Sequence, residues 1–152
     1  RRAQPYLEEK YKAYRAWGAD IGPDHNPFEA GLGWAVKLKT EVPFIGREAL
    51  LEQKRSPLKK WLCGFTVDDP RVVLLGRETI YRDGERVGWL SSGGYGHTLE
   101  KGIGYGYVRR ANGIDREYLI AGSYELEVAT ERVPCRIHLE PLYDPKMERI
   151  KA

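Results

Sequence analysis

Hydrophobic and polar residues alternate at an interval of two in the second half of the chain. Tyr124, Leu126 and Val128 alternate with glutamates. After a tight turn expected at Glu131-Arg132, the same alternation runs from residue 133 to residue 139. This pattern is typical of β-strands with one buried and one solvated face.

Four further strands are predicted upstream of these two. The second and third flank Asp83-Gly84, a dipeptide typical of a two-residue hairpin turn. Because short strands follow one another closely, the chain is expected to be mainly β with flanking helices (α+β), built around a small antiparallel barrel of Greek-key or jelly-roll type. The four strands are Leu62–Val67, Glu78–Arg82, Arg86–Ser91 and Ile103–Val108.

The first third of the chain has a different pattern. Apolar residues recur there at helical spacing, and a loop rich in Gly, Pro and Asp interrupts them. We predict a domain boundary near the linker that ends this region, which divides the chain into residues 1–56 and 57–152. The predicted elements are a helix over Pro5–Gly18, a loop over Asp20–Pro27, a strand over Trp34–Leu38, a helix over Gly46–Lys54 and a linker over Ser56–Lys60.

Composition narrows the class of protein. The 152 residues are 41% hydrophobic and carry a net charge of +3, which is too weak to indicate a nucleic-acid partner. The sequence contains no apolar run of membrane-spanning length and no signal peptide. Cys63 and Cys135 are expected to be buried free thiols in a reducing compartment. Because the sequence lacks a starting Met and opens in a helix, we expect a fragment of a longer protein.

Few residues form a recognisable chemical motif. The glycines between Ser91 and Val108 match neither a dinucleotide-binding fingerprint nor a phosphate loop, and we interpret them as turn and close-approach positions. The three histidines lie far apart in sequence, which argues against a metal site. Tyr95, Tyr105 and Tyr107, with neighbouring cations, offer a stacking surface for single-stranded nucleic acid as one hypothesis, with ordinary outer-face tyrosines as the other.

Glu29 is a candidate for ligand binding. It follows Asn26-Pro27 and precedes Trp34, and a carboxylate beside an aromatic ring can accept two N–H bonds from a planar heterocycle. Lys37, with Lys39 and Arg47, could meet an anionic tail. A structural role for Glu29, as a capping or salt-bridge residue, remains the alternative.

The order of several blocks resembles a known family. The blocks GADI, NPFEAGLGWAVKLK, FIGREALLEQK and SSGGYGHTLEKGIGYGYV follow one another as in the C-terminal part of the glycine-cleavage T-protein (aminomethyltransferase) family. The sequence is more similar still to the folate-binding half of sarcosine and dimethylglycine dehydrogenases, and to the related regulatory subunit of pyruvate dehydrogenase phosphatase. The resemblance extends from about Tyr14 to Tyr143.

This resemblance implies a tetrahydrofolate-dependent one-carbon transfer protein, with FAD in an upstream part if it is a dehydrogenase. Folate would lie between the upstream domains and the barrel, with neither nucleic acid nor membrane as a partner. The implied folate-binding residues are Glu9, Tyr11, Glu29, Trp34 and Lys37. The family's catalytic aspartate lies upstream of this sequence, so the chain alone is expected to catalyse nothing. The implied location is cytoplasmic, or the mitochondrial matrix in a eukaryote.

Two positions depart from the family pattern. The family's folate glutamate on the first helix corresponds by spacing to Tyr11, with Glu8 and Glu9 two or three residues early. Either the helix has a two-residue insertion before Tyr14 or the folate carboxylate is missing. Where T-proteins carry an arginine, this chain offers Lys37, Lys39 and Thr40, and a lysine lacks the bidentate fork of arginine. Both departures keep open a second hypothesis, a non-catalytic regulatory or interaction module with the same fold.

Overall fold

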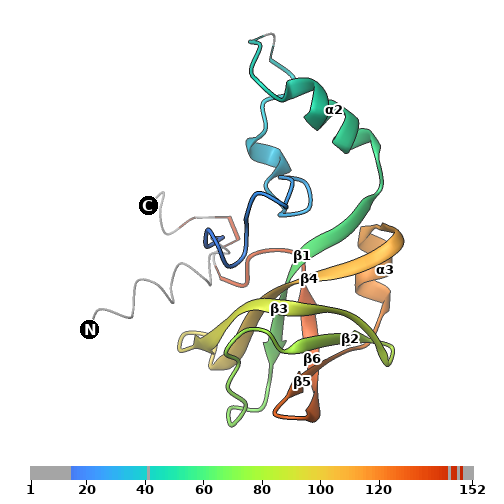
Figure 1. Cartoon of the computed structure of the whole chain (residues 1–152). Helices are drawn as coiled ribbons and strands as arrows, with labels where there is room; N and C mark the ends of the chain where they lie inside the picture. Colours follow the sequence, from blue (N-terminus) through green and yellow to red (C-terminus); the bar gives the residue numbers. More distant parts are fainter. Residues whose placement is uncertain (1–14, 41, 144, 147, 149–152) are drawn as a thin grey trace.

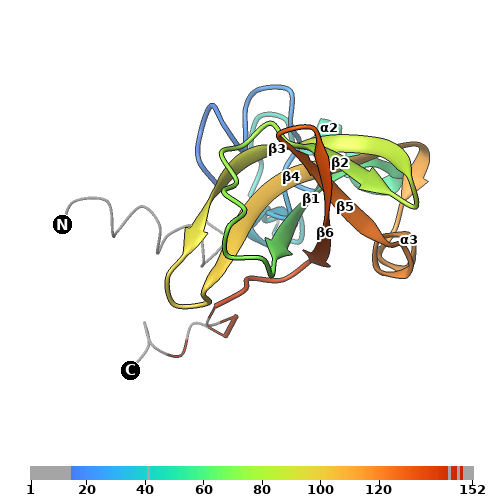
Figure 2. The same ribbon diagram turned by 90° about the horizontal axis from the view of Figure 1, so that it is seen from below.

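A closed six-stranded antiparallel barrel forms the body of the computed structural model (Figures 1 and 2). The structure describes residues 15–40, 42–143, 145–146 and 148. The strands follow one another around the barrel in the order β1-β4-β3-β2-β5-β6. Their bounds are Leu58–Val67 (β1), Thr79–Arg82 (β2), Glu85–Gly96 (β3), Lys101–Ile114 (β4), Tyr124–Val128 (β5) and Glu131–His138 (β6).

These strands confirm the predicted mainly β fold. The β2–β3 hairpin turns at Asp83-Gly84 as expected, and both residues have positive φ. The turn between β5 and β6 lies at Ala129-Thr130, two residues earlier than predicted. The barrel closes through a short seam, in which Gly64 to Thr66 of β1 pair with Arg136 to His138 of β6.

The inside of the barrel is an apolar core. Alternate residues of β1 (Cys63, Phe65 and Val67) point into it, and each is at most 1% exposed. Gly104 and Gly106 of β4 leave room for β3, because a Cβ at Gly104 would overlap Leu90 and a Cβ at Gly106 would overlap the Trp89 carbonyl. The interpretation of these glycines as close-approach positions is therefore confirmed.

A second apolar cluster lies on the outer face of β1 and β4. Tyr105 and Tyr107 belong to this cluster and are 5% and 4% exposed. The stacking-surface hypothesis is wrong for these two rings, because a base cannot stack on a buried ring. The members of this second apolar cluster are Leu62, Ile103, Tyr105 and Tyr107, with Leu99, Leu142 and Tyr143 packed against them.

An arm, residues 31–56, extends from the barrel and carries α2 (Arg47–Arg55), as Figure 1 shows. The predicted helix over Gly46–Lys54 is confirmed within one residue. The predicted strand over Trp34–Leu38 is wrong: Gly33–Ala35 forms a 3-10 turn, η1, because the Ala35 and Val36 N–H groups donate to carbonyls three residues back. Leu58 already belongs to β1, so the predicted linker to Lys60 is shorter.

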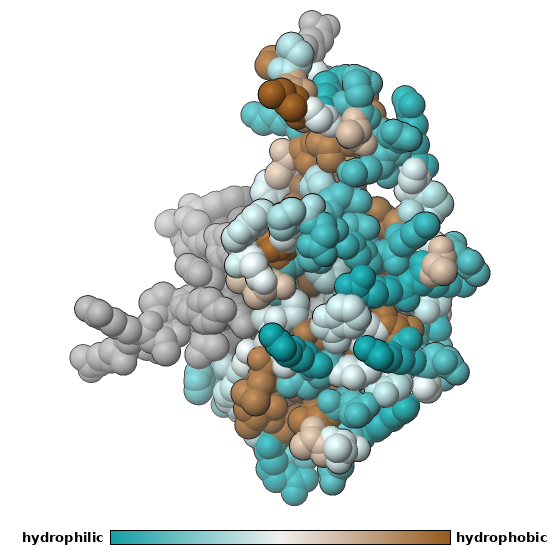
Figure 3. Space-filling model, viewed as in Figure 1, coloured by the Kyte–Doolittle hydropathy of each residue, from teal (hydrophilic) through white to brown (hydrophobic). Residues whose placement is uncertain are grey.

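Apolar side chains remain exposed along the arm. Figure 3 shows apolar surface at its far end, around the loop that leads to α2. Trp34 is 80% exposed, Val42 70% and Ile45 fully. None of the residues of α2 is buried. Among the described residues of the arm only Leu38, at 9% exposed, is buried, so the arm has no extended hydrophobic core of its own.

Three other expectations meet the structure at local features. Most of the predicted helix over Pro5–Gly18 lies outside the described residues, and its last two residues form a bridge and a turn instead, with Trp17 bridging to Ile21. The short helix α3 (Arg116–Ala121) was not predicted; Asp115 caps it by accepting from the Tyr118 N–H. Both cysteines are free thiols, as expected; Cys63 is buried, whereas Cys135 is only partly buried.

Candidate functional site

An anchor loop, residues 15–30, joins the arm to the outer face of the barrel. At its centre is Asp20, which is 1% exposed. Its Oδ1 accepts hydrogen bonds from the Ser91 and Ser92 hydroxyls at 2.6 and 2.7 Å. Its Oδ2 accepts from the Ala16 N–H at 3.0 Å. A buried carboxylate needs several donors to offset the loss of hydration, and both oxygens of Asp20 have them.

Tyr107 connects the same loop to β4. Its hydroxyl donates to the Asp20 carbonyl at 2.9 Å, and its ring stacks on His25 with 4.5 Å between ring centroids. Lys60 Nζ lies 5.7 Å from the ring centre and donates to the Asp24 carbonyl at 2.7 Å. Burial raises the pKa of Tyr107, so the phenol stays protonated and keeps this hydrogen bond.

Arg15 lies at the start of the loop. Its Nε donates to the Ala30 carbonyl at 3.1 Å, which closes the loop upon itself, and its guanidinium lies 6.0 Å from the Tyr105 ring centre. Burial lowers the pKa of Arg15, an effect that Tyr105 and Asp20 oppose. Burial likewise raises the pKa of Tyr105 to about 12. Neither group changes charge near neutral pH.

Glu29 has the structural role that its sequence context left open. Its N–H donates to Asn26 Oδ1 at 2.9 Å, and its Oε2 accepts from the Asn26 N–H at 3.1 Å, a reciprocal pair that closes the turn. Oε2 also lies 3.6 Å from Lys60 Nζ. The capping and salt-bridge interpretation is confirmed, and the folate-binding role stays a prediction.

Two other predicted folate-binding residues, Trp34 and Lys37, do not line the surface beside Glu29. Trp34 in η1 and Lys37 after it are both exposed on the arm. A depression of about 410 Å³ beside Glu29 is lined by His25 and by Leu50 of α2, among others, but not by Trp34 or Lys37. Arg47, a suggested partner of an anionic tail, donates to the Leu38 carbonyl at 3.0 Å. Glu9 and Tyr11 lie outside the described residues.

The hydrogen bonds and ion pairs of these residues hold the anchor loop in place, and the residues form no reaction centre. Within the described ranges, no three His, Cys, Asp or Glu residues come together as a metal site. Asp20 is enclosed by donors, so it has no access to a substrate. What fits a ligand is the exposed Trp34 indole, whose face can stack on a heterocycle, and the exposed Lys37 ammonium, which can pair with a carboxylate.

Sequence reasoning missed the residues that carry the anchor. Asp20 stands in the quoted block GADI, but its partners Ser91 and Ser92 are 71 and 72 positions away. Nothing in the local pattern connects these positions. The available signal was the polar pair Ser91-Ser92 at a point where β3 otherwise alternates toward a buried core.

Known proteins share this architecture. The model of the glycine cleavage T-protein C-terminal barrel domain matches residues 60–144, which is more than half of the chain. The chain belongs to this family. A solved structure of the glycine cleavage system aminomethyltransferase T from Bartonella henselae has the same fold, with a TM-score of 0.73 at 23% identity over 89% of this chain and 37% of that one.

Curated relatives extend the similarity beyond the barrel. Mitochondrial sarcosine dehydrogenase of Mus musculus is 40% identical over 93% of the chain. Mitochondrial dimethylglycine dehydrogenase of the same species is 36% identical over 86%, and its mitochondrial pyruvate dehydrogenase phosphatase regulatory subunit is 33% identical over 88%. These matches confirm the predicted resemblance. The chain spans 16%, 14% and 16% of the three relatives' lengths, respectively.

Proposed function

We propose that the chain is the C-terminal part of a tetrahydrofolate-dependent one-carbon transfer protein of the sarcosine or dimethylglycine dehydrogenase type. The observation that carries this proposal is the 40% identity to a sarcosine dehydrogenase over 93% of the chain, which includes the anchor loop and the arm. Residues 1–56 would be the tail of the folate-binding domain and residues 57–152 the C-terminal barrel.

The exposed arm supports an upstream partner domain in the same polypeptide. Trp34, Val42 and Ile45 present apolar side chains to solvent at a cost in free energy, and such surfaces mark interaction sites. The anchor loop would fix the orientation of the arm against that domain. The amine oxidation would take place upstream, with FAD as its cofactor, and the barrel would contribute no catalytic group.

Tetrahydrofolate, when bound, accepts the one-carbon unit. On this chain, the Trp34 indole would hold its heterocycle and Lys37 would pair with its anionic tail. Glu29 is engaged with Asn26 and Lys60 through Oε2, so its contribution would be made through Oε1. Glu9 and Tyr11 complete the proposed set. In a eukaryote the protein would act in the mitochondrial matrix, and the names of its curated relatives describe them as mitochondrial. The described residues include no helix long and apolar enough for a membrane span.

A tetrahydrofolate titration of the complete polypeptide, followed by tryptophan fluorescence, tests the proposal. We expect a saturable change in tryptophan fluorescence. Trp34→Phe and Lys37→Gln are each expected to weaken the affinity for tetrahydrofolate several-fold. Trp89→Phe is the matched control, because that partly exposed indole lies on the barrel under the Arg109 guanidinium, 4.3 Å from the ring centre. No saturable change at high micromolar tetrahydrofolate would contradict the proposal.

A non-catalytic regulatory module is the second candidate. It is favoured by Tyr11 at the position of the family's folate glutamate and by the 33% identity to the phosphatase regulatory subunit. This candidate predicts a well-folded polypeptide without a fluorescence response to tetrahydrofolate. Restoring a glutamate by Tyr11→Glu would then create a response only if the rest of the folate site is intact.

A further inference from the structure

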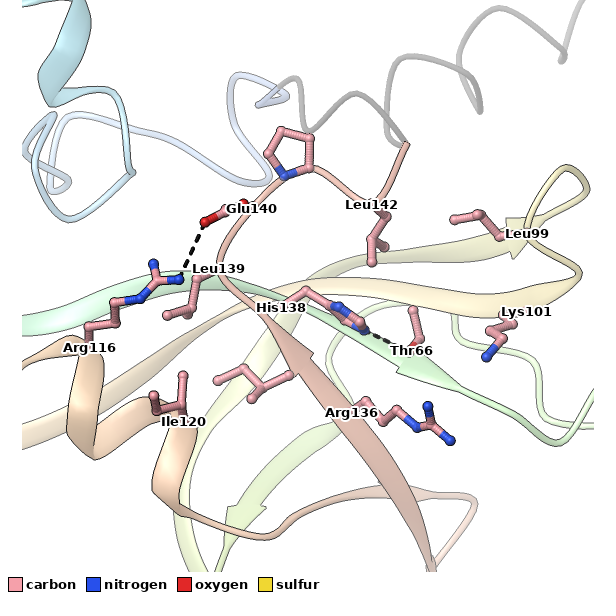
Figure 4. A pocket seen from close by; sticks show the side chains of 12 residues that line it. Thr66, Leu99, Lys101, Arg116, Ile120, Arg136, His138, Leu139, Glu140 and Leu142 are labelled. Carbon is pink, nitrogen blue, oxygen red and sulfur yellow. Dashed lines mark hydrogen bonds and ion pairs between the residues drawn. The ribbon is translucent and has the colours of Figure 1, made fainter. Parts of the chain in front are cut away.

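An open cavity of about 540 Å³ lies outside the barrel, over the seam where β1 meets β6 (Figure 4). This volume falls within the range of small-molecule sites. At its polar end the cavity lies on the outer side of β1, because Thr66 faces it while Phe65 and Val67 face the core. Ile137 and Leu139, which pack against the core cluster, line its apolar part. Residues from β1, β4, β6 and α3 line it, together with the segment that follows β6.

Polar groups gather at one end of this cavity. Thr66 Oγ1 and His138 Nε2 share a hydrogen bond of 2.9 Å across the seam. Lys101 and Arg136 flank the imidazole and both pair with Asp68, at 2.5 and 3.1 Å. Arg136 uses one of its five N–H donors in that pair, and an exposed ion pair contributes little, so its guanidinium can donate to a further acceptor.

The charge at this end favours a monoanion. Lys101 and Arg136 contribute two positive charges and Asp68 one negative charge, which leaves one positive charge uncompensated. Burial lowers the pKa of His138 first of all, and the two cations lower it further, as expected for a site of positive potential. At the other end, Arg116 and Glu140 lie 3.3 Å apart and compensate each other.

The wall between these two ends is apolar. Leu139 and Leu142 follow β6 along it, and Ile120 of α3 contributes a side chain that is 60% exposed (Figure 4). Covering the exposed surface of such an isoleucine with an apolar group lowers the free energy of the complex.

We propose that this cavity binds a small organic carboxylate, with the carboxylate between Lys101, Arg136 and His138 and the apolar body against Ile120 and Leu139. A single negative charge neutralises the excess positive charge, whereas a phosphate dianion would overcompensate it. None of these residues belongs to the proposed folate-binding set, so this site is independent of the proposed function.

Titration of the ¹⁵N-labelled 152-residue chain with sodium hexanoate at constant ionic strength tests the proposal. We expect saturable amide shifts confined to the segments that line the cavity, which are Thr66, Lys101, residues 116–120 and residues 136–142, with a Kd in the low millimolar range. Hexan-1-ol has the same apolar body without the charge and is expected to bind at least fivefold more weakly. Inorganic phosphate is expected to give no saturable shift.

Variants separate the charge from the fold. Arg136→Gln is expected to weaken hexanoate at least fivefold. Arg71→Gln is the matched control, because Arg71 is exposed, pairs with Asp69 at 2.7 Å and lies outside the cavity. Equal binding of hexanol and hexanoate to the unmodified chain, tighter binding of phosphate, or shifts scattered over the surface would each overturn the proposal, whatever the stability of the variants.

Discussion

The barrel buries its apolar residues, whereas the arm leaves most of its apolar residues exposed. In the barrel, Phe65, Ile80 and Leu126 are completely buried among one another. In the arm, Trp34 and Ile45 remain exposed, and α2 contributes no buried residue. Strand pairing brings distant segments of the barrel together, whereas the hydrogen bonds of the arm connect residues within about nine positions of one another.

The anchor loop shows how the arm is nevertheless oriented. Asp20, Tyr107 and Lys60 tie the loop to the barrel by directed hydrogen bonds, and the Tyr107 ring adds a stacking contact with His25. Directed bonds fix the geometry of the loop. A self-sufficient barrel can thus present an arm in one orientation to whatever covers it.

The largest expected effect concerns the barrel core. Leu126→Ala removes a side chain that is completely buried, so we expect a loss of about 3 kcal/mol in the free energy of unfolding from the transfer and cavity costs. Ile45→Ala in the exposed arm is the matched comparison and should change stability by less than about 0.5 kcal/mol. Urea unfolding followed by circular dichroism measures both. Similar losses would mean that the two regions do not differ.

A smaller effect is expected at the anchor. Asp20→Ala leaves the Ser91 and Ser92 hydroxyls without their shared acceptor, and we expect a loss of about 2 kcal/mol, as for a buried bond to a charged group. Asp24→Ala is the control in the same loop, because the Asp24 side chain is 77% exposed and contacts only His25 among the described ion pairs. If the two variants unfold at the same urea concentration, Asp20 is not the anchor.

The smallest expected effect is a dependence of stability on pH. Burial and the neighbouring cations lower the pKa of His138 in the folded state below its ordinary value of 6.5. The unfolded chain therefore binds the proton more readily, so the stabilising contribution is complete above about pH 6.5 and decreases as the pH falls through the folded-state pKa. Urea midpoints at several pH values should show a smaller decrease for His138→Gln than for the unmodified chain. A steeper decrease in the variant would contradict the assignment.

The sequence predicts the structure of the barrel better than it predicts the structure of the arm. Period-two alternation and the Asp83-Gly84 turn are local signals of the forces that build the barrel, and the predicted strands are confirmed. In the arm, the apolar run at Trp34–Leu38 suggested a strand, but no neighbouring strand pairs with it and local hydrogen bonds form η1 instead. Trp34 is exposed and Leu38 is buried without any strand pairing, so the apolar run does not report a strand.

The anchor and the short helix α3 were beyond local patterns for different reasons. Asp20 is defined by partners more than 70 residues away, which no window along the chain contains. The six residues of α3 are too few for a helical period to be visible. The structural role of Glu29, one of its two interpretations, is visible in the sequence because its partner Asn26 is only three positions away.

Amide hydrogen exchange of the 152-residue chain, resolved by residue, tests the contrast between barrel and arm most directly. Core amides of β1 and β4 should exchange only through global unfolding, whereas amides of α2 should exchange at least about a hundredfold faster, because no buried contact holds the helix. Asp20→Asn should accelerate exchange in the anchor loop and leave β4 unchanged. Protection of α2 equal to that of β4 would contradict the account.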